Sequence, residues 1–120
     1  MFQAIDGLPD HVVALRAVGK VTGEDYHAVL EPAVARATAG DAKARLLMVL
    51  GADFEGYDLG AVAADAGVGL GHMGSFERIA VVTDEGWVQH AIGLFGRMIP
   101  GEVRLFPDAE EAAARTWIAA

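Results

Sequence analysis

The sequence contains no cysteine, which excludes disulfides, thiolate catalysis and cysteine-ligated zinc. Basic residues are few: 9 Lys and Arg stand against 17 Asp and Glu, and the formal net charge is -8. An acidic surface repels nucleic acid, whose binding requires basic groups that displace counterions, and we therefore expect no nucleic-acid partner. It also disfavours electrostatic docking on anionic lipid, although peripheral contact with a membrane through apolar groups stays open.

Long apolar runs are also lacking, so we expect no transmembrane segment. The first residues do not show a basic region followed by an apolar core, which is the pattern of a secretory signal, and we expect a cytoplasmic protein. The 120 residues include 53% hydrophobic and 22% charged residues, an ordinary globular composition. This length suits one domain with one core, spanning residues 1–120.

The most informative stretch is the apolar run IAVV at residues 79–82. A short run that is apolar on both faces predicts a central strand covered on both sides of a sheet. Further strands are predicted at 2–6, 12–18, 44–50 and 103–106, with a loop over residues 51–57. The first two are joined by a Gly/Pro turn at residues 7–10, which predicts an antiparallel hairpin.

Helical patterns alternate with the later strands. The first begins at Thr22, where Asp25 completes a capping-box pattern, and Pro32 predicts a kink or restart within it. The second and the last are predicted to be capped by Asp58 and Asp108, and the third is predicted to begin near Glu85. This order predicts an α/β fold with a mixed five-stranded sheet, parallel apart from the N-terminal hairpin, and four helices.

Several segments stand out in this order, among them Glu24-Asp25-Tyr26, Phe54-Glu55-Gly56-Tyr57, Phe76-Glu77-Arg78 with Asp84 and Trp87, and Val103-Arg104-Leu105-Phe106 with Trp117. Together they resemble the SpoIIAA-like proteins, small bacterial domains related in fold to the STAS domain of anti-sigma-factor antagonists and likened to Sec14-type lipid-binding domains. The resemblance covers nearly the whole chain. It implies a mixed five-stranded sheet with helices on its faces and an apolar cavity beneath movable helices.

One departure from the resemblance concerns regulation. Anti-sigma-factor antagonists carry a phosphorylatable serine at the start of the helix after the third strand. The corresponding segment here reads GADFEGYDLGA and contains neither serine nor threonine. A phosphorylation switch of that kind therefore has no residue to act on.

No set of residues with catalytic or metal-binding spacing stands out, and we expect neither enzyme activity nor a cofactor. The G-x-G-x-x-G pattern at 69–74 follows a helix and precedes a strand, the reverse of a dinucleotide site, and is better explained as a linker. His27 and Glu31 are only two potential metal ligands, and Ser75 precedes a strand rather than following one.

The third predicted helix carries two apolar stripes, although packing on a sheet requires only one. Trp87, Ala91, Leu94 and Phe95 belong to the first stripe, and Val88, Ile92, Phe95 and Ile99 form the second. We expect the second stripe to be surplus to the core and partly exposed. The surplus would contact another helix, a partner subunit, a lipid or a small apolar ligand.

Two functions follow from this surplus. The first is a non-enzymatic binding module that holds an apolar small molecule or lipid between the second and third helices. Its expected binding residues are Tyr57, Leu59, Val62, Trp87, Val88, Ile92, Phe95 and Ile99. The alternative is a STAS-type protein-interaction module that uses the same helices to form a homodimer or to bind a regulatory partner.

Overall fold

The computed structural model describes residues 1–58, 60, 73–96 and 100–120. Its main sheet has five strands in the order β1-β2-β4-β6-β7. Strand β1 pairs antiparallel with β2, and the remaining neighbours are parallel, which confirms the predicted mixed sheet and N-terminal hairpin. The strands are β1 (Phe2–Ala4), β2 (Val12–Ala17), β4 (Ala44–Leu50), β6 (Phe76–Thr83) and β7 (Glu102–Phe106).

Strand β6 has a neighbour on each side, as its apolar run predicts. Val81 lies opposite Met48 of β4 and Leu105 of β7, and every residue from Ile79 to Thr83 is buried. A strand with a ladder on both edges and packed side chains on both faces is held by all of its neighbours at once. It is therefore an interior strand of the sheet, beside the middle strand β4.

A second, two-stranded sheet pairs β3 (Gly19–Val21) with β5 (Phe54–Tyr57) in parallel. The prediction of a loop over residues 51–57 was therefore wrong for residues 54–57. The pairing is fixed by contacts distant in sequence, since the amide of Gly19 donates to Asp53 O at 2.7 Å and the amide of Asp58 donates to Val21 O at 3.0 Å. Such long-range bonds leave no periodic pattern in a four-residue strand.

The first helix is one continuous run of three segments: α1 (Gly23–Asp25), the π-helical η1 (Tyr26–Leu30) and α2 (Glu31–Ala37). The predicted capping box is present, because Thr22 and Asp25 each accept a hydrogen bond from the other's backbone amide. The wider π turn directly precedes Pro32, which lies in the first turn of α2. The proline thus changes the helical winding without ending the helix. The wider turn makes room for its ring and for the hydrogen bond that is lost because proline has no backbone N–H.

Two further helices complete the described part of the chain, α4 (Gly86–Phe95) and α5 (Glu111–Ala119). Short 3-10 turns lie at η2 (Ala39–Asp41), η3 (Met73–Ser75) and η5 (Asp108–Glu110). The described residues thus hold three helices where four were predicted, and the second predicted helix falls almost wholly outside them. None of the described helices is long and apolar enough to cross a bilayer.

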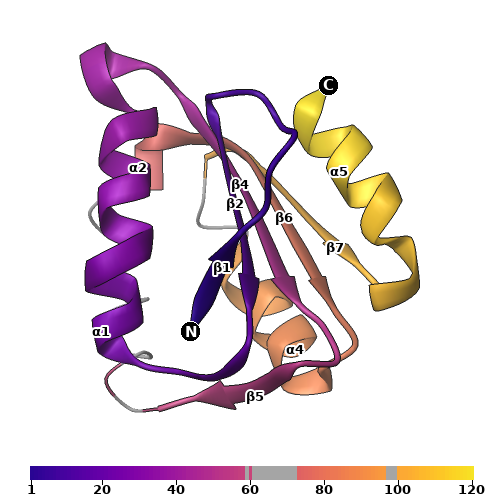
Figure 1. Ribbon diagram of the computed structural model, residues 1–120. Helices are drawn as coiled ribbons and strands as arrows, with labels where there is room; N and C mark the ends of the chain where they lie inside the picture. Colours follow the sequence, from indigo (N-terminus) through magenta and orange to yellow (C-terminus); the bar gives the residue numbers. More distant parts are fainter. Residues whose placement is uncertain (59, 61–72, 97–99) are drawn as a thin grey trace.

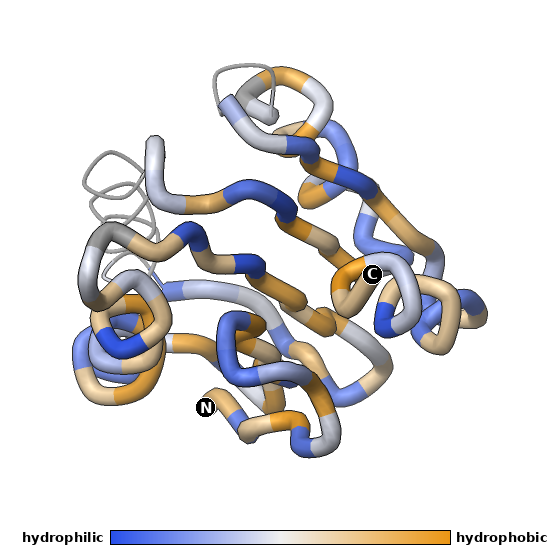
Figure 2. The backbone as a smooth tube through the Cα atoms, turned by 90° about the horizontal axis from the view of Figure 1, so that it is seen from above, coloured by the Kyte–Doolittle hydropathy of each residue, from blue (hydrophilic) through white to orange (hydrophobic). Residues whose placement is uncertain are grey.

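The helices form layers on both faces of the main sheet, with α1 to α2 on one side and α5 on the other (Figure 1). The first face packs its core around Tyr26, Leu30 and Val34 of the first helix together with Val88 of α4. The opposite face packs around Leu47, Val82, Ala114 and Ile118. Figure 2 shows the hydrophobic stretches concentrated in the strands between these layers.

Candidate functional site

Three aromatic side chains from β5 and α4 meet near the carboxyl ends of the parallel strands. The ring centroids of Tyr57 and Trp87 lie 5.8 Å apart, those of Phe54 and Tyr57 5.2 Å apart, and those of Phe54 and Trp87 6.5 Å apart. Edge-to-face and tilted contacts at these distances are favourable for aromatic rings. We call Phe54, Tyr57 and Trp87, together with the exposed Leu94 two turns further along α4, the aromatic surface.

The aromatic surface is continuous with the core. Tyr26, which has no exposed area, lies 6.2 Å from the ring of Tyr57 and 5.3 Å from that of Phe2. At the other end of this series, Trp87 is 51% exposed. The rings therefore run from the buried first helix to solvent, so that contact made at Trp87 is supported by rigid packing underneath.

The start of α4 is fixed by Thr83, the last residue of β6. Its hydroxyl accepts the amide of Glu85 at 3.0 Å, and its carbonyl accepts a side-chain hydrogen bond from Gln89 at 3.1 Å. The helix consequently begins within three residues of the strand end. This short connection places Trp87 at the edge of the sheet where ligands of α/β proteins usually bind.

For Val88, the expectation that the second stripe is surplus to the core was wrong, whereas Ile92 is partly exposed, and Ile99 and the side chain of Phe95 lie outside the described residues. Val88 is only 5% exposed and Ile92 packs against the same core cluster, whereas Trp87 is 51% and Leu94 60% exposed. The helix is therefore rotated so that the first stripe faces solvent. Sequence periodicity identifies two stripes but does not say which one the sheet covers.

Four of the predicted binding residues can be placed. Tyr57 and Trp87 lie in contact on the aromatic surface, while Val88 and Ile92 support α4 from beneath. Leu59, Val62 and Ile99 lie outside the described residues, as does the side chain of Phe95. Phe54 was missed because it fell in a segment predicted to be a loop, although an aromatic residue three positions before Tyr57 was a usable signal.

The surroundings of the aromatic surface are acidic. Glu55 lies between Phe54 and Gly56 on β5 and is exposed, and the exposed Asp84 and Glu85 directly precede α4. Carboxylates around an apolar patch disfavour an anionic ligand through like-charge repulsion. A neutral or cationic molecule is the better electrostatic match.

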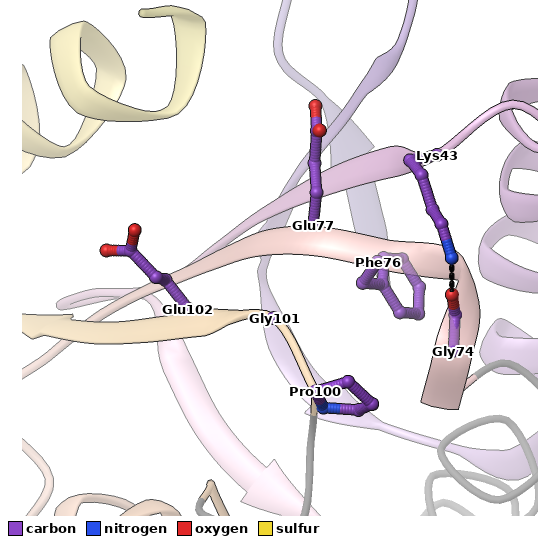
Figure 3. Close-up of a pocket in the computed structure, with 7 residues that line it drawn as sticks. All are labelled: Lys43, Gly74, Phe76, Glu77, Pro100, Gly101 and Glu102. Atoms are coloured by element: carbon purple, nitrogen blue, oxygen red, sulfur yellow. Dashed lines mark hydrogen bonds between the residues drawn. The ribbon is translucent and has the colours of Figure 1, made fainter.

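A separate hollow of about 470 Å³ lies at the opposite, amino-terminal ends of β6 and β7. Its lining includes Lys43, whose ammonium donates to the carbonyl of Gly74 (Figure 3). Figure 3 also shows Glu77 and Glu102 pointing to the other side of the strands from Phe76, so their carboxylates do not converge. The described residues that line this hollow therefore do not form the cluster of polar groups that is typical of a ligand site.

The candidate metal and catalytic residues show only isolated contacts. His27 Nδ1 lies 3.1 Å from Glu31 Oε2 on the exposed side of the first helix. Across the described ranges, no three His, Cys, Asp or Glu side chains are grouped so as to hold a metal. Ser75 ends η3 directly before β6, and most of the 69–74 glycine pattern lies outside the described residues.

The comparisons with known proteins agree with this architecture. The model of the SpoIIAA-like family matches residues 12–119. The chain belongs to the SpoIIAA-like family.

Two solved structures are similar to this SpoIIAA-like domain. An uncharacterised protein of Shewanella loihica PV-4 with a SpoIIAA-like fold shares 27% sequence identity at a TM-score of 0.77, covering 98% of this chain and 92% of that one. The unphosphorylated anti-sigma factor antagonist SpoIIAA shares 18% identity at a TM-score of 0.56, covering 98% of both chains. The second likeness shows a shared fold. No match was found among curated proteins.

On the face opposite the aromatic surface, arginines attach α5 of the SpoIIAA-like domain to the sheet. Arg45 and Arg78 donate to the last carbonyls of α5, those of Ile118 and Trp117, each at 2.9 Å. Arg16 binds both carboxylate oxygens of Glu111, at 3.0 and 2.9 Å, and holds the pKa of Glu111 below its ordinary value. These arginines serve as helix caps and ion-pair partners of α5.

Asp108 was predicted to cap the last helix, and the structure shows otherwise. No side-chain hydrogen bond caps η5, and Asp108 Oδ1 is buried without a hydrogen-bond partner. The amide of Asp108 instead donates to Asp84 Oδ1 at 3.1 Å. Burial raises the pKa of Asp108, and the nearby carboxylates of Asp84 and Glu111 raise it further.

We expect Asp108→Asn to stabilise the protein at pH 7 by about 0.5 kcal/mol, a value discounted because solvent partly reaches the side chain. An acid with a raised folded-state pKa destabilises the fold when it is ionised, and this penalty disappears as the pH falls below its ordinary pKa. The advantage of the variant, measured by thermal melting, should therefore vanish near pH 3. An advantage that persists there would rule out ionisation as its cause.

Proposed function

We propose that this SpoIIAA-like domain is a non-enzymatic binding module whose aromatic surface holds the apolar part of a neutral, lipid-like small molecule. The proposal rests chiefly on the ring series from buried Tyr26 through Tyr57 to Trp87, which remains 51% exposed. Contact between the exposed indole and water is unfavourable. A ligand that covers the indole would lower the free energy by about 25 cal/mol per Å² of apolar area removed from water. The acidic residues around it favour a ligand without negative charge.

The two tryptophans provide matched reporters for this proposal. Trp87 lies on the aromatic surface, whereas Trp117 lies on the opposite face, where Arg78 and Arg104 stack over its ring at 5.2 and 4.8 Å. Trp117→Phe leaves Trp87 as the sole tryptophan, and Trp87→Phe leaves Trp117. Each variant can be titrated with non-ionic decyl maltoside below its critical micelle concentration while emission is recorded.

We expect a saturable blue shift of Trp87 emission and an unchanged Trp117 emission, because only the first indole would be removed from water. Sodium decanoate should bind more weakly than decyl maltoside because its carboxylate meets Asp84 and Glu85. Equal shifts from the two tryptophans, or no saturation, would contradict binding at the aromatic surface.

Leu94→Lys tests the same surface without touching either tryptophan. Leu94 is 60% exposed, so a lysine there should leave the melting temperature nearly unchanged. In the Trp117→Phe background, we expect it to weaken the detergent response roughly ten-fold, equivalent to about 1.4 kcal/mol of lost apolar contact. A folded variant that binds as well as its parent would show that Leu94 is not part of the site.

A protein-interaction role is the second candidate, favoured by the family and by the fold shared with an anti-sigma factor antagonist. Residues 51–61 contain no serine or threonine, so such a role would work without a phosphorylated hydroxyl in that segment. Exposed Trp residues are typical anchors of protein interfaces. If this role is the right one, the detergent titration should show no saturable response. A photoreactive residue at position 91 should then form a cross-link to a protein in cells, and Leu94→Lys should abolish that cross-link.

A further inference from the structure

Strand β7 forms one edge of the main sheet, at the end opposite to β1. Within the described part of the chain it pairs only with β6, and its outer edge therefore presents backbone groups that a sheet would normally pair. Its side chains are accessible as well: Glu102 is 62% and Arg104 56% exposed, and Leu105 is 38% exposed. The other edge strand, β1, has only 3 residues.

The side chains of β7 divide cleanly between the two faces of the sheet. Arg104 stacks on Trp117 and Phe106 packs beside the same ring at 6.1 Å, so both face α5. Val103 packs with the opposite core cluster, on the side of α4. By strand alternation Glu102 shares the α5 face with Arg104, and the two side chains approach within 3.8 Å.

We propose that β7 is a self-association edge, which pairs antiparallel with β7 of a second copy about a two-fold axis at Val103. In this register Glu102 of each copy lies opposite Arg104 of the other, and the two Val103 residues face each other. The strand is thus complementary to itself in charge, and opposite charges directly across an antiparallel pair are stabilising.

Neighbouring registers lack this match. A two-fold axis perpendicular to the sheet leaves each side chain of β7 on the same face of the sheet in both copies. Residues directly opposite each other must also share a face, so the axis has to pass between the two copies of one residue. An axis at Arg104 would place the two Arg104 side chains directly opposite each other, and like charges in that position repel. An axis at Leu105 would leave Glu102 without an opposite charge across from it.

Side-chain size favours the same register. An axis at Val103 places Leu105 of each copy opposite Gly101 of the other. A Cβ built on Gly101 would lie only 2.6 Å from the carbonyl oxygen of Phe76, so this position has room for a hydrogen only. Gly101 therefore presents no side chain of its own to the partner's Leu105.

The test is sedimentation equilibrium of the whole chain at concentrations up to about 1 mM, since a five-residue strand pair gives only weak association. We expect the wild type to dimerise with increasing concentration. Arg104→Glu and Glu102→Arg should each weaken association roughly ten-fold or more, because each turns both cross-strand pairs into like-charge pairs.

Two combinations should restore association. The double variant Glu102→Arg/Arg104→Glu recreates both opposite-charge pairs and should dimerise like the wild type. An equimolar mixture of the two single variants should form a heterodimer that neither forms alone. Leu94→Lys, on the aromatic surface, serves as the control and should leave association unchanged, so this proposal fails or stands independently of the proposed ligand site.

A wild type that stays monomeric to about 1 mM would overturn the proposal. So would single charge reversals that associate like the wild type, or association abolished by Leu94→Lys, which would place the interface on α4. Arg104→Ala that strengthens the dimer would also overturn it, because that result requires the axis at Arg104.

Discussion

Val81→Asp should leave no folded protein at 25 °C. Val81 is 5% exposed and lies in the middle of β6, between Met48 on one side and Leu105 on the other. An aspartate there would be either an unpaired buried charge or a protonated acid without a designed partner, at a cost of several kcal/mol. The total stability of a domain is only about 5–15 kcal/mol.

The measurement is far-ultraviolet circular dichroism together with thermal melting of the purified chain. Leu94→Asp is the matched control, because it makes the same chemical change at a side chain that is 60% exposed and should keep a cooperative transition. A Val81→Asp variant that melts like the wild type would refute the buried, interior position of β6 in the sheet.

The main sheet was predictable from sequence because its signals are local. The buried run of β6, the Gly/Pro turn between β1 and β2, and the capping box of Thr22 and Asp25 each depend on residues close in the chain. Patterns of this kind report directly on burial, turn geometry and helix starts. Parallel pairing then follows from the alternation of strands and helices.

The pairing of β3 with β5 was not predictable, because it depends on contacts between segments about 35 residues apart that have no apolar alternation. The rotation of α4 was missed for a related reason. Val88 and Trp87 are adjacent and both apolar, and only the packing of α4 on the sheet decides that Val88 is buried. When a helix carries two equally apolar stripes, only its tertiary contacts determine which stripe is buried.

For the candidate site, the sequence placed Tyr57 and Trp87 in one set of expected binding residues, and the structure brings their ring centroids to 5.8 Å although they are 30 positions apart. They were grouped because both were expected to line an apolar site between the second and third predicted helices. Phe54 and the support from Tyr26 emerged only from the structure, because their contacts depend on β5 being a strand.

Gly101→Ala should destabilise the protein by about 1–3 kcal/mol, the usual range for overpacking. A Cβ at this position would lie 2.6 Å from the carbonyl oxygen of Phe76 and 2.8 Å from that of Glu77. Both atoms belong to the backbone of β6, the strand that holds the sheet together, so they cannot rotate away as a side chain could. The new methyl group must push the start of β7 away from β6.

Gly93→Ala is the matched control, because it adds the same methyl group on α4 where no atom lies within 4 Å of the new Cβ. An alanine in a helix interior is better than glycine by about 0.8–1.0 kcal/mol, so this variant should be more stable than the wild type. Chemical denaturation of the two variants should therefore shift the unfolding midpoint in opposite directions. A Gly101→Ala variant as stable as the wild type would show that β7 can move away from β6 at little cost, and the close approach at Gly101 would then not constrain the sheet.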